Sequence, residues 1–231
     1  MSGCESCAAS GSCSGSSCSG GSCGGEKKLP PGMLERYDAN VSTADGILVF
    51  IETVRSGDGI SVHPASAQLI GKASKLESGR IYGVIFGDNE LKPLYSEIYS
   101  MGVNSLYHVK DGRLARFHPE AYSEAVTSVC ERVIPASVLI GSTKRGSEIA
   151  PRIAASMGAG FVANCDDLAL DGRRIVGIKN TDGKTTRSES NVFPLVATVK
   201  ENTFPYPKPS EGGKGTVFYW KYGGDNFKEF L

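Results

Sequence analysis

The sequence predicts an α/β fold: a mainly parallel, doubly wound sheet with a β-hairpin extension. The first observation is a series of short, continuous apolar runs between residues 47 and 140, which are typical of strands buried on both faces. The second is that segments of helical period follow these runs four times, which favours a parallel sheet with helices on both faces. The third is that the alternation of strand and helix patterns stops after residue 162, where Asp-Gly pairs separate short β-type runs.

Two strand–helix units open the regular part of the chain. The run Ile47–Ile51 predicts the first strand, and Pro64 can open a helix that ends before Gly79. The second strand is predicted at Ile81–Phe86. A short helix is predicted at about 93–101, because apolar residues recur there at helical spacing.

Two further units and a hairpin region follow. A third strand is predicted at 103–109, a helix opening at Pro119, a fourth strand at 137–140 and a helix at 148–157. Short β-type runs then continue as far as 199, and we expect them to form hairpins. Two Asp-Gly pairs mark the predicted turns: Asp171-Gly172 and Asp182-Gly183.

Length and charge exclude several classes of protein. The 231 residues fit one or two domains, and 25 Lys and Arg against 25 Asp and Glu give a net charge of zero, which argues against a nucleic-acid binder. The sequence has no apolar run long enough for a transmembrane helix, and its start lacks the cationic and apolar regions of a secretory signal. We therefore expect a cytoplasmic protein without a membrane span.

Composition divides the chain into four segments. Cys, Ser and Gly occupy 21 of the first 25 positions, so residues 1–25 cannot form an apolar core. Residues 26–45 are interpreted as a linker and 46–207 as the regular domain. Residues 208–231 are rich in aromatic side chains, which we expect either to cover this domain or to anchor a partner.

Five cysteines in the first segment indicate metal ligation: Cys4, Cys7, Cys13, Cys18 and Cys23. Four thiolates are the usual ligand set of an iron–sulfur cluster, and without an export signal reduced thiols are favoured over disulfides. We expect a 4Fe–4S cluster on Cys4, Cys7, Cys13 and one of Cys18 or Cys23. The alternatives are a zinc site, disulfides, or a flexible segment that binds no metal.

Six blocks of the regular domain resemble the alpha subunit of electron transfer flavoproteins. The most specific is VLIGSTKRGSEIAPRIA at 138–154, and PLVATVKENTF at 194–204 resembles the strand that closes that family's first domain. The other four blocks lie at 46–52, 66–73, 102–109 and 119–122. The resemblance runs from about residue 45 to 207 and implies the adenine-nucleotide-hydrolase-like fold of that first domain.

The resemblance also implies an electron-transfer context. In the family a second domain carries the FAD-binding motifs, whereas only about 24 residues follow Pro207 here. We therefore assign no FAD-binding residue to this chain and expect FAD in a partner subunit. The implied partners are an electron transfer flavoprotein beta-like subunit and an acyl-CoA dehydrogenase-like protein or another flavin reductase or dehydrogenase.

Other candidate sites carry weaker signals. The loop 141–146 lies between a strand and a helix, where an anion can bind, but it lacks the phosphate-loop pattern. We expect Glu148 to satisfy the dipole of the following helix. His63 and His118 each precede a proline at a helix start, which is typical of capping residues.

Neither cysteine of the regular domain is predicted to be reactive. Cys130 lies on the apolar face of a predicted helix, and the thiolate of Cys165 is disfavoured by Asp166 and Asp167.

We assign no catalytic residue and expect a non-catalytic subunit of an oxidoreductase complex. That subunit would relay electrons through its N-terminal cluster to or from a partner flavin. The alternatives are a non-redox scaffold subunit and a nucleotide-binding protein of the same fold that uses the loop 141–146.

Overall fold

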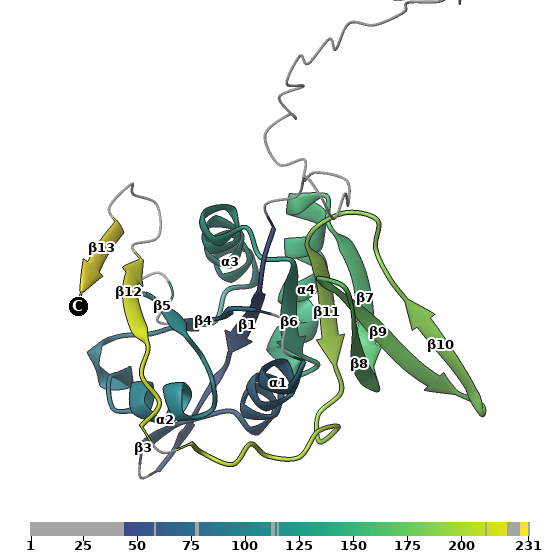
Figure 1. The fold of residues 1–231 in the computed structure, drawn as a ribbon. Coiled ribbons are helices and arrows are strands. Elements are labelled where there is room, and N and C mark those ends of the chain that lie inside the picture. Colours follow the sequence, from purple (N-terminus) through teal and green to yellow (C-terminus); the bar gives the residue numbers. More distant parts are fainter. Residues whose placement is uncertain are drawn as a thin grey trace, which may run out of the picture.

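An eight-stranded sheet forms the centre of the computed structural model (Figure 1). The structure describes residues 44–57, 59–76, 79–111, 114, 116–210, 212–220 and 227–230, so the cysteine-rich segment 1–25 lies outside the described residues. The strand order is β13-β12-β5-β4-β1-β6-β11-β7, and every neighbouring pair except β12 and β13 is parallel. The strands of this sheet are β1 (Ile47–Ile51), β4 (Ile81–Phe86), β5 (Ser105–Val109), β6 (Ser137–Gly141), β7 (Gly160–Cys165), β11 (Leu195–Val199), β12 (Thr216–Trp220) and β13 (Phe227–Phe230).

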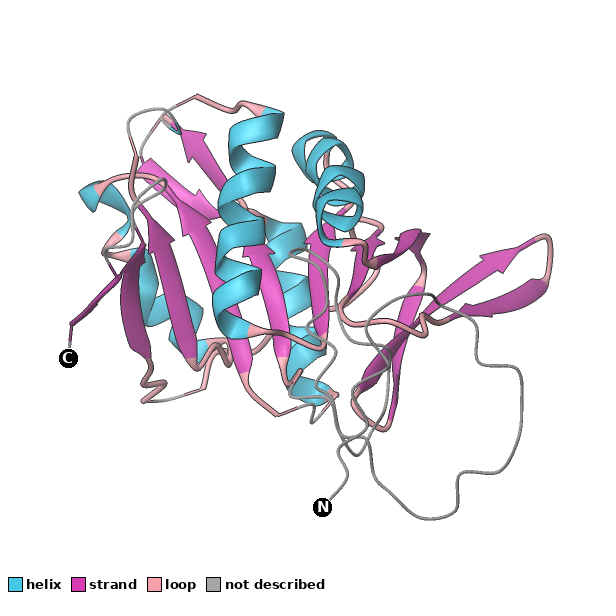
Figure 2. Cartoon of the chain, turned by 90° about the horizontal axis from the view of Figure 1, so that it is seen from above, coloured by secondary structure: helices cyan, strands magenta, loops and turns pink. Residues whose placement is uncertain are grey.

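Helices cover both faces of the sheet, as the sequence predicts (Figure 2). Successive side chains of a strand point to opposite faces, and β1 shows this clearly. Val49 and Ile51 pack in one core cluster with α1 (Pro64–Lys75) and α2 (Leu94–Ser100). Leu48 and Phe50 pack in the other with α3 (Pro119–Val133) and α4 (Lys144–Met157). All five side chains of β1 are buried, which explains why its sequence is continuously apolar.

The helix starts confirm some predicted caps and correct others. His63 caps α1, since its Nδ1 accepts a hydrogen bond from the Ala65 N–H at 3.2 Å. His118 occupies the same position before α3 but makes no such bond. The predicted start of α4 at residue 148 is wrong: the helix begins at Lys144, because Thr143 caps it by accepting from the Gly146 N–H at 2.9 Å.

Three antiparallel strands form the predicted hairpin extension: β8 (Asp167–Asp171), β9 (Arg174–Thr181) and β10 (Lys184–Ser188). The run 191–199 does not belong to it, in contrast to the prediction. Its apolar part forms β11, which is fully buried and parallel between β6 and β7. A second hairpin, β2 (Thr53–Ser56) with β3 (Gly59–Val62), was not predicted, since only Val62 of its eight strand residues is buried. A short 3₁₀ helix, η1 (Asn89–Leu91), follows β4.

The chain crosses the α1 and α2 side of the sheet after β11 and adds β12 beside β5 (Figure 1). The crossing is close, because a Cβ added at Gly71 would lie 2.8 Å from the Cβ of Pro207. The aromatic side chains of β12 then pack on this domain. The rings of Phe218 and Tyr107 stack with their centroids 5.0 Å apart, and Trp220 Nε1 donates to Ser128 Oγ at 2.9 Å. Residues 216–220 thus cover this domain, which is the first of the two roles expected for the C-terminal aromatic residues.

Candidate functional site

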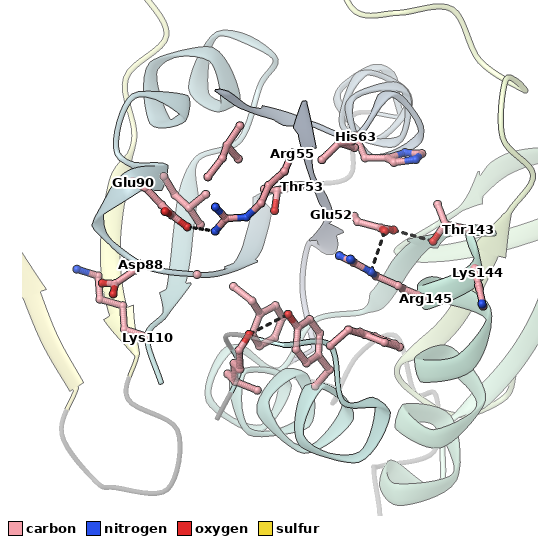
Figure 3. A pocket seen from close by; sticks show the side chains of 18 of the residues that line it. Glu52, Thr53, Arg55, His63, Asp88, Glu90, Lys110, Thr143, Lys144 and Arg145 are labelled. Carbon is pink, nitrogen blue, oxygen red and sulfur yellow. Dashed lines mark hydrogen bonds and ion pairs between the residues drawn. The ribbon is translucent and has the colours of Figure 1, made fainter. Parts of the chain in front are cut away.

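A cleft of about 930 Å³ opens where the carboxyl ends of β1, β4, β5 and β6 meet (Figure 3). The chain proceeds from β1 to β4 and β5 on one side, and β6 lies on the other side of β1. Such a reversal of strand order is where open α/β sheets bind ligands. The cleft is therefore the candidate functional site among the residues that the structure describes.

Glu52 occupies the inner end of this cleft. It directly follows β1, and its Oε2 accepts a hydrogen bond from Thr143 Oγ1 at 2.7 Å. Its Oε1 lies 3.7 Å from Arg145 Nε, and the Glu52 side chain is only 11% exposed. The carboxylate thus bridges the hydroxyl that caps α4 and a guanidinium from the first turn of that helix (Figure 3).

The backbone of Glu52 is held as firmly as its side chain. Its N–H donates to Ser66 Oγ at 3.0 Å, and its carbonyl accepts from the His63 N–H at 2.8 Å. Ser66 Oγ in turn donates to the carbonyl of Phe50 at 3.3 Å. The start of α1 therefore fixes the backbone position of Glu52. No single sequence motif contains both Glu52 and Ser66.

Aromatic rings form one wall of the cleft. Tyr122 stacks on Phe86 with ring centroids 4.6 Å apart, and Phe117 meets Tyr122 edge-on at 5.0 Å. The Tyr122 hydroxyl donates to the carbonyl of Leu114 at 3.1 Å, and burial raises its pKa. The guanidinium of Arg145 lies 5.5 Å from the centroid of the Phe117 ring, within the range of a cation–π contact.

The charges around the cleft are balanced. The lining includes four Lys or Arg side chains and five Asp or Glu side chains. At the rim, Arg55 forms an ion pair with Glu90, and Lys110 Nζ donates to Asn89 Oδ1 at 2.5 Å. The cleft therefore lacks the excess of positive charge that a polyphosphate ligand favours.

The loop 141–146 has a structural reason for its glycines. A Cβ at Gly146 would lie 2.0 Å from the carbonyl oxygen of Gly141, so the close approach of α4 to the end of β6 excludes any larger residue. The prediction that Glu148 satisfies the helix dipole is wrong, because the first turn of α4 holds no acidic residue. Glu52, which comes from another strand, is the carboxylate that approaches the helix start.

The predicted metal ligands Cys4, Cys7, Cys13, Cys18 and Cys23 all lie outside the described residues. Among the residues that are described, no group of three or more His, Cys, Asp or Glu side chains could hold a metal ion. Cys130 and Cys165 are buried. Burial raises the pKa of the Cys130 thiol strongly and that of Cys165 to about 11, so both thiols are protonated at neutral pH.

His108 is a buried polar centre that sequence reasoning missed. It lies in β5 with no exposed surface, and its Nε2–H donates to the carbonyl of Gly87 at 3.0 Å. Because Nε2 carries the proton, Nδ1 accepts from the hydroxyl of Tyr95. Burial lowers the pKa of His108 to about 4. The apolar neighbours Leu106 and Val109 gave no signal of this network.

A comparison with protein families identifies the fold. The electron transfer flavoprotein domain matches residues 50–222, which extend from β1 through β12. The chain belongs to the electron transfer flavoprotein family. Within the described part of the chain, no helix is long and apolar enough to cross a membrane.

Several curated relatives share this domain. The subunit LctC of the NAD⁺- and ferredoxin-dependent lactate dehydrogenase of Acetobacterium woodii is 28% identical over 194 residues, which cover 79% of this chain and 45% of LctC. Protein FixB of Azorhizobium caulinodans is 29% identical, covering 74% of this chain and 48% of FixB. The electron transfer flavoprotein subunit alpha of Megasphaera elsdenii is 27% identical, covering 66% and 47%. The chain spans about half the length of these relatives.

The family implies a flavin in the complex, but the groups at this cleft do not fit FAD. A dinucleotide needs donors for its pyrophosphate at the helix start. Here the Thr143 hydroxyl donates to Glu52, and the Arg145 guanidinium faces the same carboxylate. These two side-chain donors at the inner end of the cleft are therefore already used by the protein itself.

Proposed function

We propose that this chain is an electron-transfer subunit of a flavoprotein dehydrogenase or reductase complex. Its regular domain would bind an electron transfer flavoprotein beta-like subunit, and its N-terminal cysteines would hold an iron–sulfur cluster. The cluster would pass single electrons to or from a flavin in the partner. The observation that carries the proposal is the family match over residues 50–222, combined with a set of five cysteines in the first 25 residues.

The hairpin extension supports a docking role for one side of the domain. The strands β9 and β10 form an arm that extends away from the central sheet (Figure 1). Residues 180–187 are exposed on both faces of this arm. An isolated two-stranded ribbon is only marginally stable in water, so a surface that covers it would stabilise it. Residues 180–187 carry Lys184 and Arg187 against one acidic residue, Asp182, and this positive excess favours a partner surface with carboxylates.

The residues immediately before β1 are anchored at the amino ends of the strands. Ala44 is 2% exposed and lies before β1, at the amino end of this strand. Its carbonyl accepts a hydrogen bond from Arg173 Nη1 at 3.3 Å, and the Asp45 N–H donates to the carbonyl of Ile134 at 3.1 Å. Ala44 and Asp45 therefore lie at the end of the sheet opposite the cleft, which opens at the carboxyl ends of the strands.

Chemical analysis of the full chain tests the cluster. Anaerobically purified protein is expected to contain about four iron atoms and four acid-labile sulfides per chain, as a 4Fe–4S cluster requires. Replacing Cys4 and Cys7 together by Ser should abolish both, whereas replacing the buried Cys130 by Ser should change neither. Iron-free wild-type protein would contradict the cluster and leave a non-redox scaffold subunit as the favoured function.

Co-expression with a beta-like subunit tests the docking face separately. The two chains are expected to elute together in size-exclusion chromatography, and the double variant Lys184→Glu, Arg187→Glu should weaken the complex at low ionic strength. Replacing the surface residue Lys208 by Glu, far from the arm, serves as the charge control. If the double variant bound the beta-like subunit as tightly as the Lys208→Glu control, the arm would not be the docking face.

A further inference from the structure

We propose that Glu52 is a built-in anion that closes the crevice between β1 and β6 to phosphate-bearing ligands. The inference concerns the described domain and does not depend on the iron–sulfur proposal. Open α/β sheets bind anions in the crevice where the strand order reverses, usually at the start of the helix that follows a strand. Here that helix is α4, which has 14 residues and follows β6 at the point of reversal.

The crevice contains the donors that a phosphate group would use. Thr143 supplies a hydroxyl and Arg145 a guanidinium, and both belong to the segment that starts α4. In a crevice open to ligands, such groups would face an empty space or water. In this chain they face the carboxylate of Glu52, at 2.7 Å from the hydroxyl and 3.7 Å from the guanidinium.

The main chain of Glu52 is held by the start of α1, and its carboxylate is held by Thr143 at the start of α4. The Glu52 N–H donates to Ser66 Oγ, the Glu52 carbonyl accepts from the His63 N–H, and the side chain reaches Thr143. The main-chain bonds fix the position from which the side chain extends, and the carboxylate can turn away only by losing its hydrogen bond with Thr143 and its contact with Arg145. A phosphate that approached Arg145 would therefore meet a fixed negative charge, which repels it at short range.

Two of the other three cations that line the cleft have partners elsewhere. Arg55 is paired with Glu90, and Lys110 donates to Asn89 and lies 4.6 Å from the ring centroid of Tyr219. Since the lining carries five carboxylates against four cations, its overall charge does not attract an anion either. The fold thus has the crevice of a nucleotide-binding sheet, but the carboxylate of Glu52 lies where the negative charge of a phosphate would lie.

Titration calorimetry with inorganic phosphate and with AMP tests this assignment. Wild-type protein should bind neither probe at millimolar concentration. Glu52→Gln removes the charge but keeps an oxygen that can accept from Thr143, and we expect this variant to bind phosphate at least about tenfold more tightly than wild type. Glu52→Asp keeps the negative charge, so this variant should not gain phosphate binding. Glu90→Gln removes a carboxylate at the rim of the same cleft and should also leave phosphate binding unchanged.

Two further measurements make the result decisive. Adding Arg145→Gln to the Glu52→Gln variant should remove the acquired binding, because the guanidinium would hold the phosphate. Thermal unfolding checks that each variant is folded, and Glu52→Ala is a second charge-removing variant if Glu52→Gln fails that check. Phosphate or AMP binding by the wild-type chain would overturn the proposal, and so would folded Glu52 variants that gain no affinity.

Discussion

Glu52 and Thr143 are 91 positions apart in the chain, yet their side chains share a hydrogen bond of 2.7 Å. The bond joins the end of β1 to the start of α4 across the crevice where the strand order reverses. Thr143 takes part in two bonds at once, since the same hydroxyl oxygen accepts from the Gly146 N–H. One hydroxyl therefore both begins a helix and orients the carboxylate that fills the cleft.

Replacing Thr143 by Val should destabilise the domain. The variant loses the cap of α4 and leaves the buried Glu52 carboxylate without its hydroxyl donor, for an expected cost of about 1–3 kcal/mol in the free energy of unfolding. Urea denaturation followed by circular dichroism measures this cost. Thr143→Ser keeps both hydrogen bonds and should lose less than half as much. Equal losses in the two variants would show that the methyl group, not the hydroxyl, stabilises the helix start.

His108 should make the domain sensitive to acid. Its pKa is lowered to about 4 by burial, whereas an unfolded chain has a histidine pKa of about 6.5. The unfolded state therefore binds the proton first, and stability is complete above about pH 6.5 and is lost as pH falls toward 4. The loss should approach about 3 kcal/mol. Urea midpoints measured at intervals from pH 7 to pH 4 would record it.

The variant His108→Gln isolates this contribution from other titrating groups. Glutamine does not ionise, and its amide can donate to Gly87 and accept from Tyr95. Its free energy of unfolding should change less than that of wild type between pH 6.5 and pH 4, even if the variant is less stable at pH 7. Parallel pH profiles for the two proteins would rule out His108 as the acid-sensitive group.

The aromatic strand β12 should contribute to the stability of the central sheet. Phe218 stacks on Tyr107, and replacing Phe218 by Ala should cost about 1–3 kcal/mol, less than a fully buried ring because the Phe218 side chain is only partly buried. Tyr206 is 51% exposed in the crossing segment, so Tyr206→Ala should change stability by less than about 0.5 kcal/mol. Trp220 is the single tryptophan of the chain, so its fluorescence can follow the unfolding of both variants.

The two buried cysteines should resist alkylation in the folded protein. Burial raises the pKa of the Cys165 thiol to about 11 and that of Cys130 further, and only the thiolate reacts. Peptide mass spectrometry after iodoacetamide treatment at pH 8 should find Cys130 and Cys165 unmodified, and modified once urea is added. Rapid labelling of either residue without denaturant would show that its helix or strand opens locally.

The sequence was sufficient to predict four of the eight strands of the central sheet: β1, β4, β5 and β6. The predicted strands Ile47–Ile51 and Ile81–Phe86 match β1 and β4, because buried parallel strands are continuously apolar and are bounded by charged or glycine residues. The error at β11 has the same origin, since an apolar run fits a hairpin strand and a central strand equally well. Only the pairing with β6 and β7, distant in the chain, decides between them.

The cleft was harder to predict than the sheet. The glycines of the loop 141–146 were recognised as lying between a strand and a helix, but nothing local indicates that Glu52 reaches that helix. The contact depends on β1 and β6 being neighbours, which is a property of the topology. His108 was missed for a similar reason, because its partners Tyr95 and Gly87 lie on other elements.

The central claim, that this chain relays electrons through its N-terminal cysteines, is tested most directly by electron paramagnetic resonance. The full chain is purified without oxygen, reduced with dithionite and compared at low temperature with the variant Cys4→Ser, Cys7→Ser. The account predicts an iron–sulfur signal in the wild-type chain that disappears in the variant. A silent spectrum from reduced wild-type protein that contains no iron would contradict the account.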